Sequence, residues 1–141
     1  MTHVNQKRVW LGALVGFVVW SIWSVAIGML LLGPRYPAAQ EAGQFLKEPR
    51  YGFFPVAWFV ILFLLSYILA WLYAGLRATY GAGPKTALAV GILVGFAAGF
   101  PGNFAMAAWL PASRVFPLGW MLDMWVGAVL AAFVAAWLYR D

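Results

Sequence analysis

Residues 53–76, FFPVAWFVILFLLSYILAWLYAGL, are apolar almost throughout and contain no Asp, Glu, Lys, Arg or His. Because an α-helix rises about 1.5 Å per residue, a helix of this length crosses a hydrocarbon core about 30 Å thick. The unbroken apolar run at 60–65 lacks the alternation that a strand of a membrane barrel needs. The stretch therefore predicts a membrane-spanning helix.

The rest of the chain has the same character, so the sequence predicts four spans in an all-α membrane protein. Only 9% of the 141 residues are charged and 65% are hydrophobic, whereas soluble domains have about 25% charged residues. The charged residues divide the chain into spans at about 9–32, 53–76, 86–110 and 118–139. We expect these spans to form a single domain over residues 1–141.

The connections between the spans are short apart from the first, which predicts an up-down bundle. Within the first connection, residues 37–48 have apolar side chains on one helical face, and this segment ends before Pro49. We expect a short helix there, lying at the membrane interface. Four flanking residues are typical of interfacial anchors, although they could instead bind a phosphate or lipid headgroup. They are Arg35, Tyr36, Arg50 and Tyr51.

Basic residues indicate the orientation of the chain. In a four-span protein the N-terminus, the second connection and the C-terminus share one side, and their basic residues lie close to helix ends, where the positive-inside rule acts most strongly. These residues are Lys7, Arg8, Arg77, Lys85 and Arg140. The first apolar run is longer than the core of a signal peptide, about 7–15 residues, so we expect it to be retained. The sequence thus predicts a multi-pass protein of the cell membrane with cytoplasmic termini.

Small residues recur four apart and mark faces where helices can approach closely. The third span contains Gly91, Gly95 and Gly99, and the first contains Gly12 and Gly16. Such GxxxG rows allow two backbones to come into contact. They serve either packing within the chain or association with another membrane subunit or a second copy, and the sequence leaves both uses open.

Asp123 is the only charged residue inside a predicted span. A lone carboxylate there costs about 2.5–3.5 kcal/mol on insertion scales, so it needs partners or a function. Counted from the helix ends, Asn103 lies at nearly the same depth, and Ser21 and Ser24 lie in the same half of the membrane. We expect these four residues to form a polar cluster. The alternative is that Asp123 reaches the interface or pairs with Arg114.

The third span has an irregular sequence beside this cluster, and tryptophans are expected around it. Gly99, Pro101 and Gly102 predict a kinked or locally unwound helix, which frees carbonyl groups. Broken helices are tolerated where they line a cavity, although an ordinary kink stabilised by Asn103 is the simpler interpretation. The expected walls of the cluster are Trp20, Trp23, Trp58 and Trp125.

Residue types that are missing exclude several kinds of site. His3 is the only histidine and there is no cysteine, so we expect no metal site, no haem and no other cofactor. No second buried acid, Ser-His pair or nucleotide-binding loop is present, so no catalytic residue is assigned and an enzyme is not expected. The net charge of +5 suits anionic lipids, and no basic run with interleaved aromatics points to nucleic acid.

Several features together give the chain a recognisable ground plan. The first span contains Trp20 and Trp23, the second ends in Tyr73-Ala-Gly, the third is glycine-spaced, and the last runs from Trp120 to Trp137. This plan resembles that of small bacterial four-helix integral membrane proteins of uncharacterised function. The resemblance covers most of the chain and implies an architecture, but it implies no activity.

Three functional hypotheses follow. The first is a non-catalytic membrane subunit that binds lipid or other helices, including a second copy, through its small-residue faces. The second is a small transporter or channel component for a proton, a cation or a small polar substrate, which uses Asp123, Asn103 and the break at Pro101. The third is a membrane enzyme that acts on a lipid.

Overall fold

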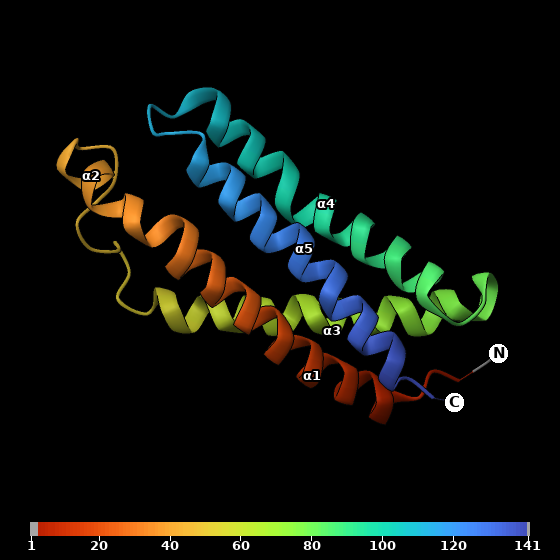
Figure 1. Ribbon diagram of the computed structural model, residues 1–141. Helices are drawn as coiled ribbons and strands as arrows, with labels where there is room; N and C mark the ends of the chain where they lie inside the picture. The colour runs from red at the N-terminus through yellow and green to blue at the C-terminus, as the bar shows by residue number, and fades with distance from the viewer. Residues whose placement is uncertain (1–2, 141) are drawn as a thin grey trace.

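The computed structural model describes residues 3–140, which are helical apart from short connections and contain no strand (Figure 1). Residues 1, 2 and 141 of the expected domain lie outside this range. The elements in chain order are α1 (Gln6–Ala26), the π-helix η1 (Ile27–Leu32), the 3₁₀ helix η2 (Gly33–Arg35), α2 (Tyr36–Glu41), α3 (Phe54–Tyr80), α4 (Pro84–Trp109) and α5 (Val115–Leu138).

Four helical segments within residues 3–140 are long and apolar enough to cross a membrane. The prediction of an all-helical chain with four long apolar helices is therefore confirmed. Both termini lie at the end of the bundle that also carries the α3–α4 connection, which we call the termini end (Figure 1). The opposite end carries α2 and the α4–α5 connection, and we call it the α2 end.

Helix α5 is the centre of the bundle, because its contacts with α4 and α1 are the most extensive between any two helices and it also packs against α3. Small residues make the α1–α5 contact close: a Cβ built on Gly12 would lie 3.1 Å from the Cα of Ala135. The glycine row of α4 packs on α5 in the same way, since a Cβ on Gly91 would lie 2.7 Å from the Cα of Val129. Both glycine rows are thus buried within the chain.

Hydrogen bonds join the two ends of the chain and hold the α3–α4 connection. The backbone N–H of Asn5 donates to the hydroxyl of Tyr139 over 2.9 Å, and its side-chain amide donates to the carbonyl of Arg140 over 3.1 Å. At the α3–α4 connection, Gly83 has a φ of 126° and its N–H donates to the hydroxyl of Tyr73 over 3.0 Å. At the termini end, hydrogen bonds therefore connect the first and last described segments and stabilise the α3–α4 connection.

The first connection differs from the prediction in two ways. The chain stays helical beyond residue 32, and α2 then ends at Glu41, so the helix expected over 37–48 is shorter than predicted. Gly43 ends it in the left-handed region, with a φ of 74°. The N–H groups of Gly43 and Gln44 reach back to the carbonyls of Gln40 and Ala39 over 3.1 and 2.9 Å, which is the Schellman pattern. Residues 42–53 then form a non-helical segment.

The π-helix η1 allows the chain to remain helical across Pro34. Because proline has no N–H and its ring clashes with the carbonyl four residues earlier, an α-helix cannot continue unchanged through it. Instead the N–H of Gly33 bonds the carbonyl of Gly28, five residues back. The side chain of Arg35 donates to the carbonyl of Leu31 over 2.7 Å. Arg35, an expected interfacial anchor, therefore caps a carbonyl of the preceding helix η1.

Candidate functional site

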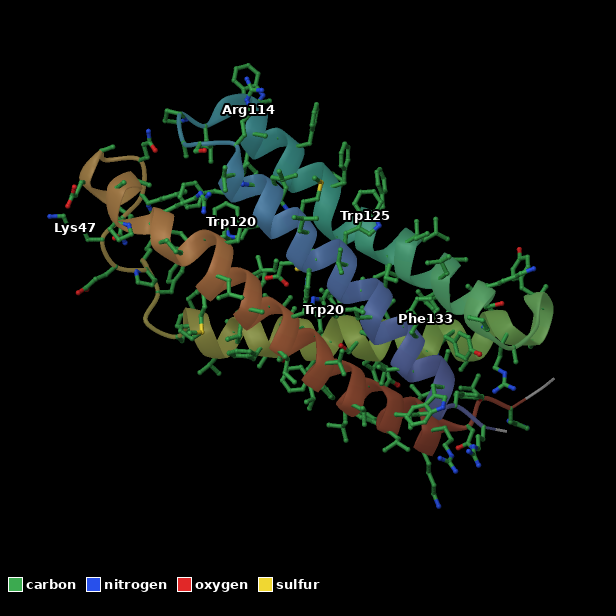
Figure 2. The ribbon with its side chains drawn as sticks, in the orientation of Figure 1. Trp20, Lys47, Arg114, Trp120, Trp125 and Phe133 are labelled. Atoms are coloured by element: carbon green, nitrogen blue, oxygen red, sulfur yellow. The ribbon has the colours of Figure 1, made fainter. Side chains whose placement is uncertain are left out.

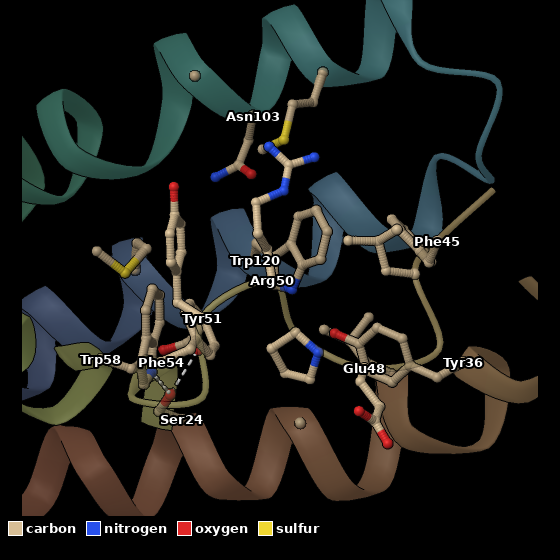
Figure 3. Close-up of a pocket in the computed structure, with 18 of the residues that line it drawn as sticks. Ser24, Tyr36, Phe45, Glu48, Arg50, Tyr51, Phe54, Trp58, Asn103 and Trp120 are labelled. Atoms are coloured by element: carbon tan, nitrogen blue, oxygen red, sulfur yellow. Dashed lines mark hydrogen bonds between the residues drawn. The ribbon is translucent and has the colours of Figure 1, made fainter. Parts of the chain in front are cut away.

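A cavity of about 990 Å³ lies at the α2 end of the bundle. It is lined by α1, η1, α2, α3, α4 and α5, and residues 45–51 of the first connection border it (Figure 3). Its volume is at the upper end of the range of small-molecule pockets, about 300–1,000 Å³. Most of its walls are apolar, including Val25, Leu32, Phe54, Phe59, Met106 and Met124.

Asp123 on α5 lies on the wall of this cavity and is 4% exposed. The hydroxyl of Ser24 on α1 donates to its Oδ2 over 2.7 Å. The indole N–H of Trp58 on α3 in turn donates to the Ser24 hydroxyl over 2.9 Å. Three helices therefore hold the carboxylate through one chain of hydrogen bonds, which appears as dashed lines in Figure 3.

The backbone around Asp123 is fixed by Trp20. The indole of Trp20 is fully buried between α1, α3 and α5, and it donates to the carbonyl of Asp123 over 3.2 Å (Figure 2). Gly127, one turn further along α5, makes room for this ring, because a Cβ built there would overlap the indole. Gly127 was not recognised as a site residue from the sequence. Its position one turn from the only charged residue of the span is the signal that could have identified it.

Two buried oxygen atoms on the cavity wall have no hydrogen-bond partner. They are Oδ1 of Asp123 and Oδ1 of Asn103. Asn103 is 8% exposed. Nearly all buried polar groups in proteins are paired, and an unsatisfied buried acceptor costs about 1–3 kcal/mol, more if it is charged. Two residues that line the cavity therefore each have an acceptor without a donor.

Three members of the expected polar cluster line the same cavity, and two of them are hydrogen-bonded to each other. Ser24 bonds Asp123, whereas Asn103 lies across the cavity on α4 and donates to the carbonyl of Gly99 in its own helix over 2.7 Å (Figure 3). Ser21 has a buried hydroxyl without a partner and does not line the cavity. Three of the four expected residues therefore share one cavity, but Asn103 forms no hydrogen bond to Asp123 or Ser24, because equal depth does not decide the direction in which a helix presents a side chain. The alternative partner Arg114 is an exposed residue at the N-cap of α5.

The expected break in the third span is also wrong as an unwinding. Helix α4 is continuous from Pro84 to Trp109, with Pro101 inside it. A proline removes one N–H from the hydrogen-bond ladder, and the neighbouring turns keep the backbone helical. Gly99 packs on α5, where a Cβ would lie 3.0 Å from the Cβ of Met124. Gly102 lines the cavity, and a Cβ there would meet nothing within 4 Å.

The expected tryptophan walls and interfacial anchors divide between different places. Trp58 lines the cavity, whereas Trp23 bonds the carbonyl of Leu122 and Trp125 packs against Phe96 on α4. Of the four expected anchors, three line the cavity: Tyr36, Arg50 and Tyr51. The guanidinium of Arg50 is directed toward Asn103 in Figure 3. The proximity of Arg50 to the cavity depends on the path of residues 42–53, which the residue pattern did not predict.

No protein-family model, curated protein or solved structure matches this chain. The resemblance to small four-helix membrane proteins stays a prediction. The cavity itself is therefore the basis for a functional assignment.

The chemistry of the cavity is that of a binding site for a hydrogen-bond donor or a cation. The unpartnered oxygen of Asp123 can accept hydrogen bonds, and an ionised carboxylate here would also attract a cation. Within residues 3–140 no group of three or more His, Cys, Asp or Glu side chains could hold a metal ion. The apolar and aromatic walls favour an organic ligand with an apolar body over a hydrated ion.

Proposed function

We propose that this chain is a multi-pass membrane protein that binds a small organic molecule with a cationic or hydrogen-bond-donating group and carries it across the membrane. The membrane assignment is supported by large apolar side chains on the outer surface of the bundle. Leu30 is 79% exposed, Trp109 is 87% exposed and Ile22 is 66% exposed. A water-soluble protein rarely exposes extended apolar surface of this kind, whereas lipid tails would cover it.

The observation that carries the proposal is the unpartnered Oδ1 of Asp123 on the wall of a cavity large enough for a small molecule. A structural carboxylate would have both oxygens satisfied. Here Ser24, whose hydroxyl accepts from Trp58, donates to one oxygen, and the other has no partner and is left for a ligand. An ionisable residue inside an apolar bundle is typical of substrate and ion pathways.

The packing of α4 favours this function over a helix-binding module. Such a module would need a free glycine face, but Gly91 and Gly95 lie against Val129 and Trp125 of α5. A second protein cannot reach these glycines without separating α4 from α5. With cytoplasmic termini, the cavity at the α2 end would open toward the outer side of the membrane, with α2 near the interface.

A transport assay tests the proposal. The purified protein is reconstituted in liposomes, and uptake of radiolabelled phenylethylamine is followed under a pH gradient. We expect Asp123→Asn to lower the initial rate by about tenfold or more, because a hydrogen bond to a charged group is worth about 1.5–3 kcal/mol. Glu41→Gln is the matched control, since Glu41 is exposed at the end of α2 and does not line the cavity. Equal uptake by wild type, Asp123→Asn and empty liposomes would refute the proposal.

A further inference from the structure

Besides Asp123, three charged residues of the first connection line the cavity: Lys47, Glu48 and Arg50. Arg50 lies on the side of Asn103, whereas the carboxylate of Glu48 is directed away from Arg50 in Figure 3. Arg50 lines the cavity, and its guanidinium is directed toward Asn103 (Figure 3). Arg50 forms no hydrogen bond or ion pair with any other residue in the range 3–140. A guanidinium has five N–H donors, so Arg50 can donate to the free Oδ1 of Asn103 and still bind an anionic group. This part of the cavity is its cationic pole.

The anionic pole lies on the other side. It consists of Asp123 with its hydrogen-bonded partners Ser24 and Trp58, and Ser24 faces Asn103 from across the cavity in Figure 3. The walls between the poles are apolar. A ligand with a single charge would place its charged group at only one of the two poles. Asp123 is 4% exposed, and exclusion of water strengthens an electrostatic interaction at that pole.

We propose that the cavity binds a zwitterionic amphiphile. Its ammonium group donates to Asp123, its phosphate or carboxylate is bound by Arg50, and its apolar body lies against the walls. This inference rests on the proposed function and defines the class of its ligand. Arg50 is the natural partner for such an anion, because guanidinium binds phosphate and carboxylate through paired hydrogen bonds.

The ammonium group must carry N–H bonds. Oδ1 of Asp123 lacks a hydrogen-bond donor and not only a counter-charge, and a quaternary ammonium group has no hydrogen to donate. An ethanolamine-type headgroup should therefore bind more tightly than a choline-type headgroup that has the same net charge.

The same chemistry has two sources: an aminophospholipid of the bilayer and a free zwitterionic amphiphile. Helices α3 and α4 diverge toward the α2 end, and the cavity is lined by Trp58 on α3 and by Gly102 and Met106 on α4 (Figure 1). This arrangement is compatible with entry from the bilayer as well as from water, so the experiment separates the two sources.

The test uses four probes that share a dodecyl tail: dodecylphosphoethanolamine, dodecylphosphocholine, dodecyl phosphate and dodecylamine. Binding to the full chain in a non-ionic maltoside is measured by native mass spectrometry and by tryptophan fluorescence. We expect dodecylphosphoethanolamine to bind at least about tenfold more tightly than each of the other probes. The common tail means that the difference reports the headgroup alone.

Variants that remove one charge show which residue binds which group of the probe. Arg50→Gln should abolish the advantage of dodecylphosphoethanolamine over dodecylamine, and Asp123→Asn should abolish its advantage over dodecyl phosphate. Arg35→Gln is the matched control for Arg50→Gln, since Arg35 bonds Leu31 and does not line the cavity. Arg50 is exposed, so its substitution should not disturb the fold, and Asn at 123 retains an acceptor for Ser24. Gel filtration and thermal unfolding verify that each variant is folded.

The outcomes distinguish this inference from the proposed function. Equal binding of all four probes to wild type, or an unchanged preference in Arg50→Gln, would overturn the zwitterion assignment. If dodecylamine binds in an Asp123-dependent way and the phosphate adds nothing, this inference fails and the proposed function stands. If no amine binds in an Asp123-dependent way, both fail. A competition experiment identifies the source of the ligand. If nanodiscs of phosphatidylethanolamine displace the soluble probe and nanodiscs of phosphatidylcholine do not, the ligand is a lipid of the bilayer. If neither displaces the probe, the ligand is a free amphiphile.

Discussion

The hydroxyl of Ser24 lies 2.7 Å from Oδ2 of Asp123 and donates a hydrogen bond to it, which joins α1 to α5 at the wall of the cavity. One oxygen of this cavity-lining residue is held from the α1 side, whereas the other, Oδ1, is buried and has no hydrogen-bond partner. Trp58 donates to the same hydroxyl over 2.9 Å and so brings α3 into the arrangement. The orientation of a single carboxylate thus depends on three helices.

Removal of the Ser24 hydroxyl should therefore loosen the carboxylate. We expect Ser24→Ala to destabilise the protein by about 1–3 kcal/mol, because the indole N–H of Trp58 and Oδ2 of Asp123 both lose their partner. Amine binding should weaken as well. Thermal unfolding in detergent and amine titration measure the two effects. Ser24→Thr keeps a hydroxyl and serves as the control; if Ser24→Ala matched wild type in both assays, the hydrogen-bond chain would have no role.

Gly127→Ala should act on the same site from the other side of α5. The added methyl group overlaps the indole of Trp20, which then loses its hydrogen bond to the carbonyl of Asp123. Overpacking of this kind costs about 1–3 kcal/mol. Gly75→Ala is the matched control, since a Cβ at Gly75 meets nothing within 4 Å. Unfolding midpoints of the two variants should differ, and equal midpoints would show that Trp20 moves without cost.

Gly95→Leu tests whether the glycine row of α4 serves the fold. A Cβ on Gly95 would lie 2.9 Å from the Cα of Trp125, so leucine forces α4 away from α5. We expect the protein to unfold or aggregate in mild detergent, as judged by gel filtration. Gly75→Leu, at an exposed position of α3, should remain monodisperse. A stable, monodisperse Gly95→Leu protein would mean that the α4–α5 contact is not required.

Pro101→Ala should leave amine uptake unchanged and raise stability. Helix α4 is continuous through this position, and proline inside a helix costs about 3 kcal/mol relative to alanine. Chemical denaturation in detergent and the liposome uptake assay give the two readouts. Loss of uptake in a stable Pro101→Ala protein would show instead that the proline has a functional role.

The parts of the molecule that follow from local composition could be predicted from the sequence. Each long apolar run forms a helix regardless of its neighbours. Where no water can bond the backbone, its N–H and C=O groups must bond to each other within the segment. The level of Asp123 and Ser24 along their helices followed from counting residues, and the two are in contact. Their partner across the cavity did not follow, because the rotation of α4 is set by contacts such as Gly91 with Val129.

The first connection illustrates why the remainder was not predictable. Apolar spacing indicated a helix over 37–48, but the left-handed Gly43 ends α2 and redirects the chain. Phe45 then packs edge-on against Phe116 with ring centroids 4.6 Å apart, and this tertiary contact outweighs the local helical pattern. The position of Arg50 beside the cavity is a consequence of that path.

The bonds from Asn5 to Tyr139 and Arg140 have a practical consequence for engineering. Since the beginning and the end of the described chain touch, two copies fused head to tail through a brief soluble linker would both insert with the same polarity. A reporter attached at either extremity would sample the same compartment. A circularly permuted version, opened between α3 and α4, should retain the bundle.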